Sequence, residues 1–228
     1  LNLTKILRRI LMEWIKSRNP LDYKIAIARM EGIVDKIISG DEQETIWLLE
    51  HNEIYTAGTS TKDIHLENVR GAPIINTNRG GQLTFHGPGQ RIIYLMVNLE
   101  RFSYDIRKYV NFLEQLIMNT LYEFNISTHR WDKAIGVWTY KQNSRKIIMK
   151  DRHKIASIGI RVRKKISFHG ISVNINPNLD FFDKIILCGL ENTKATSAKE
   201  LGVKISFNDF DEALKFNFEK LLKNYAKI

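Results

Sequence analysis

The chain contains a single cysteine, Cys188, which is the first candidate for covalent chemistry. A thiol becomes a strong nucleophile when it ionises, and a nearby cation favours the ionised form. Cys188 lies in the apolar run from Ile185 to Leu190, where a lone cysteine is more often an inert core residue. The residues around it therefore leave both interpretations open.

A glycine-rich run provides the second candidate. Residues 79–90 have the sequence RGGQLTFHGPGQ and hold four of the protein's 13 glycines. Glycine permits backbone conformations and a close ligand approach that a side chain would block. The run lacks the Gly-Lys-Ser/Thr ending and the G-x-G-x-x-G spacing of phosphate-binding loops. Its composition is compatible with a ligand-binding loop and also with a pair of structural hairpins.

The net charge of +10 is concentrated in one segment. Residues 141–165 contain ten basic residues and one acidic residue, Asp151, so +9 of the charge lies there. We expect a docking surface for an acidic partner, with a solvated hairpin as the alternative. A nucleic-acid-binding module is less favoured, because only Phe168 lies near this charge to stack on bases. The six histidines show no paired helical spacing, so no metal site is expected.

Helices and strands must position these candidates. Apolar residues recur at helical spacing in residues 22–39, which end before Gly40, and in residues 106–124, for which Ser103 is the predicted N-cap. A closing helix is predicted over residues 208–225, and a short helical turn over 179–186 leads to Cys188. Short apolar runs predict strands at residues 45–49, 74–75, 92–97, 135–140, 155–162 and 167–175.

The elements do not alternate regularly, so the sequence predicts an α+β fold with a mixed, largely antiparallel sheet covered by helices. Because the chain has four prolines and no Gly/Ser linker, we expect a single domain over 1–228, with residues 1–12 as at most a peripheral extension. Arg8 and Arg9 interrupt the apolar opening stretch, and no run approaches the ~18 apolar residues of a membrane span. We therefore expect a cytoplasmic protein with no membrane partner.

Four blocks of the sequence resemble the lipoyl(octanoyl) transferase family. They are residues 79–90, the run KIASIGIRV at 154–162, His169-Gly170-Ile171 and Cys188-Gly189. Their order and spacing match, including the 34 positions from Lys154 to Cys188, and the resemblance covers the chain from about Glu13 to Gly202. It implies a catalytic domain with the fold of the biotin and lipoate ligases. One departure is Ile135, where the family usually has Pro, and it affects one strand entry rather than the chemistry.

The resemblance implies an acyltransferase that serves protein lipoylation. Cys188 would accept an octanoyl group from octanoyl-acyl carrier protein as a thioester. It would pass the group to a lysine of a lipoyl domain, in 2-oxoacid dehydrogenase E2 subunits or the glycine cleavage H protein. Lys154 would lie beside Cys188 and lower the pKa of its thiol. The substrate-binding residues implied are Arg79, Gly80, Gly81, Gln82, Leu83, Thr84, Phe85, His86, Ser157, Ile158, Gly159, Gly170, Ile171 and Ser172; no metal or cofactor is implied.

Two other enzymes of the same fold remain alternatives. An ATP-dependent lipoate or biotin ligase would bind a nucleotide and would have no use for a catalytic thiol. A lipoyl-domain amidotransferase would use the same thiol but would take its octanoyl group from another lipoyl domain. The requirement for ATP separates the first alternative, and the identity of the donor separates the second.

Overall fold

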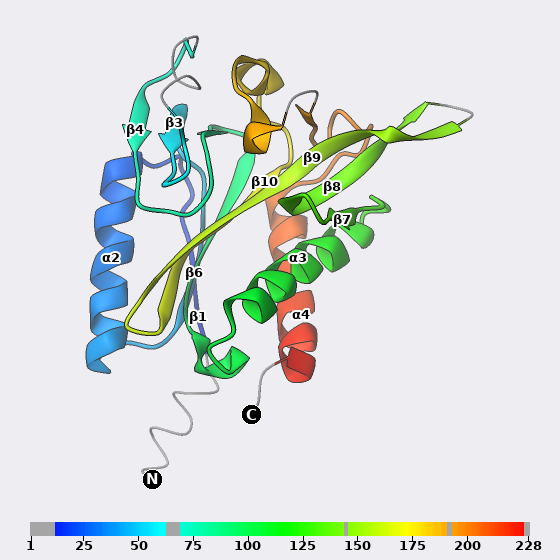
Figure 1. The fold of residues 1–228 in the computed structure, drawn as a ribbon. Helices are drawn as coiled ribbons and strands as arrows, with labels where there is room; N and C mark the ends of the chain where they lie inside the picture. The colour runs from blue at the N-terminus through cyan, green and yellow to red at the C-terminus, as the bar shows by residue number, and fades with distance from the viewer. Residues whose placement is uncertain (1–11, 63–68, 144–145, 191–192, 226–228) are drawn as a thin grey trace.

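The computed structural model describes residues 12–62, 69–143, 146–190 and 193–225, and for residues 141–151, 188 and 225 it describes the backbone alone. Within these ranges an eight-stranded sheet forms the centre and a three-stranded sheet lies beside one end of it (Figure 1). The strands are β1 (Glu13–Lys16), β2 (Thr45–Leu49), β3 (Ile54–Ala57), β4 (Ile74–Asn76), β5 (Thr84–His86), β6 (Gln90–Asn98), β7 (His129–Trp131), β8 (Ala134–Asn143), β9 (Lys146–Arg163), β10 (Ile166–Asn174) and β11 (Lys194–Ala195). The helices are α2 (Tyr23–Ser39), α3 (Ile106–Tyr122), α4 (Phe207–Tyr225) and the short 3-10 helices η2 (Leu99–Phe102), η3 (Leu179–Lys184) and η4 (Leu187–Gly189).

The strand order confirms the predicted mixed, largely antiparallel sheet. The large sheet runs β1-β2-β6-β10-β9-β8-β7, and β11 pairs with β9. Its neighbours are antiparallel except for the β1–β2 and β11–β9 pairs, which are parallel. The small sheet has the order β4-β3-β5, with β3 and β4 parallel.

Helices cover both faces of the large sheet, and the two-residue period of the strands explains how (Figure 1). On β2, Trp47 and Leu49 pack in the cluster that contains the buried face of α2. Ile46 and Leu48 point to the opposite cluster, which contains the buried faces of α3 and α4. Strands β2 and β10 are therefore buried at every position, and the middle of β6 is a continuous apolar run, because helices cover both faces of the sheet.

The helix ends follow local capping chemistry. The carboxylate of Asp22 accepts the Ile25 N–H at 3.1 Å, and Gly40 adopts a φ of 88° after the last turn of α2, as the sequence predicts. The predicted cap of α3 is wrong by two residues. Asp105, not Ser103, caps α3 by accepting the N–H groups of Arg107 and Lys108. Ser103 instead ends the preceding η2 with a φ of 58°.

The described basic residues of the segment are spread along a long strand. Strand β9 alone spans 18 residues, and the charged positions Arg152 and Arg161 lie nine residues apart on it. At ~3.3 Å per residue, about 30 Å of strand separates them. The side chains of residues 141–151 lie outside the described part of the chain. The described basic residues therefore lie in two regions, at the β8–β9 end and at the β9–β10 turn with Lys164 and Lys165, and the predicted docking surface stays a prediction.

Candidate active site

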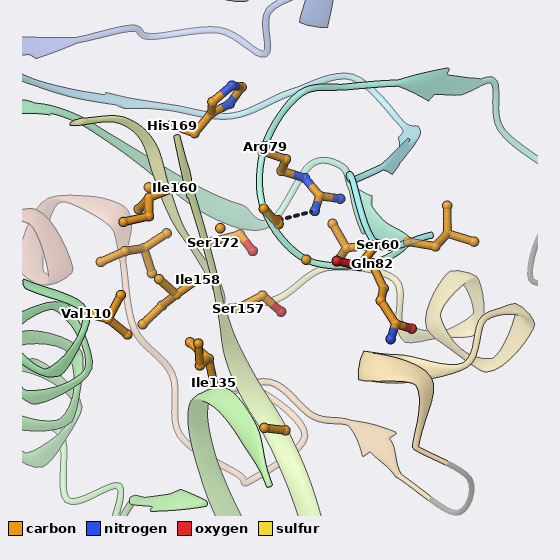
Figure 2. Close-up of a pocket in the computed structure, with 18 of the residues that line it drawn as sticks. Ser60, Arg79, Gln82, Val110, Ile135, Ser157, Ile158, Ile160, His169 and Ser172 are labelled. Atoms are coloured by element: carbon orange, nitrogen blue, oxygen red, sulfur yellow. Dashed lines mark hydrogen bonds between the residues drawn. The ribbon is translucent and has the colours of Figure 1, made fainter. Parts of the chain in front are cut away.

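A cavity of about 470 Å³ lies between α3, β9, β10 and the glycine-rich run (Figure 2). Lys154 and nearly all of the predicted substrate-binding residues line it. These are Arg79, Gly80, Gly81, Gln82, Leu83, Thr84, His86, Ser157, Ile158, Gly159, Gly170, Ile171 and Ser172. Segments that are distant in the sequence therefore meet around one hollow, as the resemblance implies.

Phe85 is the exception, since it does not line the cavity. Successive side chains of a strand point to opposite faces, so on β5 Thr84 and His86 face the cavity while Phe85 faces away. Its ring stacks on Phe181 of η3 with a centroid separation of 4.3 Å. Phe85 thus packs against the segment that precedes Cys188, and its predicted contact with a substrate stays a prediction.

Small residues allow the glycine-rich run to lie directly against β9. The Gly80 N–H donates to the Ile160 carbonyl at 3.1 Å. A Cβ on Gly159 would lie 3.0 Å from the Gly80 oxygen, and a Cβ on Gly58 would lie 2.3 Å from the Gly81 oxygen. Side chains at Gly58 and Gly159 would therefore push the run away from the strand and change the shape of the cavity.

Arg79 enters the cavity wall as a buried cation. Its Nε and Nη2 donate to the Thr56 hydroxyl at 3.2 and 2.7 Å, and its Nη1 donates to the Gly80 carbonyl at 3.1 Å. Burial lowers the pKa of the Arg79 guanidinium, because desolvation disfavours the charged form. Among the described residues, this guanidinium donates to neutral hydroxyl and carbonyl oxygens of Thr56 and Gly80 rather than to carboxylates.

A directed chain of hydrogen bonds continues from Thr56 across the cavity floor. Because the Thr56 hydroxyl accepts from Arg79, it donates its own proton to His86 Nε2 at 3.3 Å. His86 Nδ1 then donates to Gln90 Oε1 at 2.7 Å, and Gln90 Nε2 donates to Asn174 Oδ1 at 2.9 Å. Asn174 Nδ2 ends the chain at the Thr196 carbonyl, 2.9 Å away. The chain links the cavity wall to the loop that follows Cys188.

Three neutral histidines lie at this polar end of the cavity. Desolvation lowers the pKa of His51 to about 4 and that of His169 to about 3, with the charge of Arg79 adding to the effect at His169. Desolvation also lowers the pKa of His86 well below its ordinary value. His51 Nε2 accepts the hydroxyl proton of Tyr94 at 2.7 Å, and burial raises the pKa of that phenol. The imidazoles therefore contribute hydrogen bonds without charge at neutral pH.

The opposite end of the cavity is apolar. Figure 2 shows Val110, Ile135, Ile158 and Ile160 on one side of the hollow and Arg79, Ser60 and Gln82 on the other. Val110 comes from the first turns of α3, and Ile135 from the start of β8. A slot of this composition suits a saturated chain, whose burial contributes ~0.8 kcal/mol for each CH₂ group.

Lys154 lies on β9 at the edge of the cavity and is only 5% exposed. Its Nζ donates to the Ile135 carbonyl at 2.9 Å and lies 5.2 Å from the centre of the Trp138 ring. The Lys154 side chain crosses close to Gly136, where a Cβ would lie 2.5 Å from Lys154 Cε. The Ile135 departure from the family pattern therefore keeps the backbone oxygen that orients the lysine, and β8 begins regularly at Ala134.

Strand pairing brings the backbone that follows Cys188 next to Lys154. Cys188 lies in η4, and six residues later β11 pairs with β9 at His153 and Lys154. Leu187 lines the same cavity as Lys154. The amide of Gln82 fills the space beside Gly189, where a Cβ would lie 2.6 Å from it. The side chain of Cys188 lies outside the described residues, so its predicted role stays a prediction.

Several cavity residues were missed by the sequence analysis, among them Tyr23, Tyr94, Val110, Ile135 and His169. His169 adjoins Gly170 in a block that was recognised, so its neighbour was the available signal. Nothing local marks Tyr94, because it lies in an apolar strand and its partner His51 is 43 residues away. Within the described ranges, no group of three or more His, Cys, Asp or Glu side chains could hold a metal ion. The described helices include none with the length and hydropathy of a membrane span.

Comparison with known proteins places the chain in a family. The family model of the lipoyl protein ligase A/B catalytic domain matches residues 22–219. The octanoyltransferase of Rickettsia felis is 40% identical over 215 residues, covering 93% of this chain and all of that protein. The octanoyltransferase of Bartonella tribocorum is 43% identical over 212 residues, covering 92% of this chain and 86% of that protein.

Solved structures of the same fold are more distant in sequence. A lipoate-protein ligase A bound with ATP matches with a TM-score of 0.66 at 13% identity, over 93% of this chain and 85% of that one. The biotin protein ligase of Aquifex aeolicus in complex with biotin and ATP matches with a TM-score of 0.54 at 12% identity, over 94% and 71% of the two chains. At such identities the likeness shows the fold alone, whereas the sequence relatives show the family. The chain therefore belongs to the octanoyltransferase family, acyltransferases built on the lipoyl protein ligase A/B catalytic domain.

Proposed function

We propose that the protein transfers an octanoyl group from acyl carrier protein to a lysine of a lipoyl domain, through a thioester on Cys188. The observation that carries the proposal is the pairing of β11 with β9, which brings the Cys188 segment back to Lys154 at the edge of the cavity. The division of the cavity into an apolar end and a polar end also supports the proposal. The apolar end would hold a saturated chain of medium length, and the polar end would hold its carbonyl group.

The reaction has two balanced steps. In the first, the sulfur of Cys188 attacks the acyl carbonyl on the carrier; the new C–S bond replaces the old one, and the carrier leaves as a thiol with the Cys188 proton. In the second, the amine of the lipoyl domain attacks the Cys188 thioester. A C–N bond forms, the C–S bond breaks, and the amine proton passes to the cysteine. The two large partners therefore need not bind together.

A cation beside the Cys188 thiol has two opposing effects, on the thiolate fraction and on the nucleophilicity of the thiolate. If a cation lowered the pKa of a thiol from ~8.5 to ~6.5, the thiolate fraction at pH 7.5 would rise from about 10% to about 90%. Nucleophilicity falls with pKa at a slope of ~0.45, which costs a factor of about eight. The two effects nearly cancel in the first step. Lys154 therefore acts chiefly in the second step, where a low-pKa thiolate leaves readily and a neutral amine can take the proton of the incoming lysine.

Docking of the acidic carrier follows from the two separated basic regions. Lys133 is exposed and also lines the cavity, and Arg152 lies two residues from Lys154. The turn at Lys164 and Lys165 follows Arg163, which lies about 36 Å from Arg152 along β9. We place the carrier at the Lys133 and Arg152 end, because its acyl group must reach Lys154.

Intact mass after incubation with octanoyl-acyl carrier protein, without ATP, tests the proposal. The wild-type protein gains one octanoyl group that hydroxylamine removes, and the Cys188→Ser variant does not gain it. The loaded protein then passes the group to a lipoyl domain. An absolute requirement for ATP would instead indicate a ligase. Loading from an octanoylated lipoyl domain but not from the carrier would indicate an amidotransferase.

A further inference from the structure

Glu114 is a buried carboxylate on the face of α3 that packs against the sheet. It is 5% exposed, and its buried neighbours on that face include Leu113 and Ile117. Glu114 Oε1 accepts the Gly136 N–H at 3.0 Å, and Oε2 accepts from Arg130 Nε at 3.0 Å. A charge in such a position is costly unless it is fully hydrogen-bonded. These contacts lead directly to the catalytic lysine.

The Gly136 N–H and the Ile135 C=O belong to the same trans peptide group. Its oxygen accepts Lys154 Nζ at 2.9 Å, while its N–H, on the opposite edge, donates to Glu114 at 3.0 Å. One peptide plane therefore lies between the amine and the carboxylate. Hydrogen bonds in such a chain polarise one another, so the carboxylate strengthens the acceptor that holds Lys154.

We propose that Glu114 is a positioning residue for Lys154. It fixes the peptide whose carbonyl aims the amine at the cavity. The inference rests on the proposed function, in which Lys154 takes a proton during transfer to the lipoyl domain. Gly136 contributes to the same positioning by leaving space for the lysine, because a Cβ at this position would lie 3.0 Å from Lys154 Nζ.

The path from the carboxylate to the amine is short. Two hydrogen bonds of 2.9 and 3.0 Å and the width of one peptide place the carboxylate at most about 8 Å from Nζ. Arg130 binds the other carboxylate oxygen at 3.0 Å and so helps to hold Glu114 against the Gly136 N–H. Loss of the acceptor at Glu114 should therefore move the Ile135 carbonyl and, with it, the amine of Lys154.

Single-turnover transfer from the preformed acyl-enzyme to a lipoyl domain tests the inference. In Glu114→Leu, which leaves the Gly136 N–H without its acceptor, the maximal rate falls at least tenfold while the half-saturating concentration of lipoyl domain stays the same. Glu114→Gln keeps an oxygen that can accept this N–H, so it retains most of the rate. Glu44→Leu is the matched control, since Glu44 is also a largely buried carboxylate paired with an arginine, Arg101 at 2.8 Å. It leaves the rate unchanged.

Equal losses of rate in Glu114→Leu and Glu114→Gln, or an equal loss in Glu44→Leu, would overturn the inference in favour of simple helix packing. A wild-type protein that forms no acyl-enzyme would refute the proposed function instead. The inference then has a readout without turnover: trace labelling with acetic anhydride at one pH, followed by peptide mass spectrometry, gives the labelling rate of Lys154. A changed rate in Glu114→Leu and the wild-type rate in Glu114→Gln support the inference, and identical rates in all three proteins contradict it.

Discussion

Replacing Gly136 by alanine should displace Lys154, because the new Cβ would meet both the lysine and the backbone of β9. A Cβ at this position would lie 2.5 Å from Lys154 Cε and 2.7 Å from the Ala156 oxygen, whereas ordinary contacts begin near 3.4 Å. The lysine must therefore retreat by about 0.9 Å. A misplacement of ~1 Å at a reacting group can cost about 100-fold in rate. The φ of +133° adds strain of ~1–3 kcal/mol.

Gly40→Ala is the matched control, because Gly40 also has a positive φ, +88°, but nothing lies within 4 Å of a Cβ there. Both variants are compared in chemical denaturation and in single-turnover transfer to a lipoyl domain. We expect Gly40→Ala to lose ~1 kcal/mol of stability and less than twofold in rate. Gly136→Ala should lose about 100-fold in rate. If folded Gly136→Ala protein transferred within threefold of Gly40→Ala, the reasoning about Lys154 placement would be refuted.

Three further predictions concern the cavity floor and the docking surface. In the unfolded chain histidines become protonated near pH 6.5, whereas the pKa of His51 in the folded protein is about 4 and that of His169 is about 3. Because the unfolded state therefore binds more protons, the free energy of unfolding should fall as the pH drops below about 6.5. Each of the two histidines should contribute up to ~1.4 kcal/mol per pH unit. Chemical denaturation at pH 7.5 and 5 should show this loss, and His169→Asn should reduce it; an unchanged slope would count against a neutral His169. Thr56→Val removes the hydroxyl that accepts from Arg79 and donates to His86, so it should lower the free energy of unfolding by ~2–3 kcal/mol. Thr56→Ser keeps the hydroxyl and should lower it by less than ~1 kcal/mol. Equal losses in the two variants would contradict the hydrogen-bonded chain. Lys133→Glu should raise the KM for octanoyl-acyl carrier protein several-fold and weaken the salt dependence of that KM. Lys164→Glu should change neither the KM nor its salt dependence. The reverse result would indicate that the carrier docks at the β9–β10 turn.

Local patterns predicted the elements better than their contacts. The helix over residues 22–39 and its end at Gly40 followed from apolar spacing and capping residues, both of which are local properties. The cap of α3 was misplaced because η2 is too short to leave a periodic signal before it. The boundary of a single catalytic domain over 1–228 stays a prediction, since the family match covers residues 22–219.

The candidate site was predicted through the resemblance rather than through composition. Phe85 points away from the cavity because neighbouring side chains of the three-residue strand β5 point to opposite faces. The matching sequence block alone does not show which of its residues face the cavity. The link from His51 to Tyr94 and the link from Glu114 to Gly136 both join residues more than 20 positions apart. The division of the basic segment depended on the length of β9, which exceeds the predicted strand at residues 155–162.

The hydrogen-bonded chain under the cavity has a consequence for proton movement. It starts at a guanidinium that only donates and ends at a backbone carbonyl that only accepts. Between them, the side-chain amides of Gln90 and Asn174 do not pass protons along as water or imidazole can. The floor therefore behaves as an insulator and not as a proton wire. A proton released when the acyl group changes partners therefore does not leave along this chain.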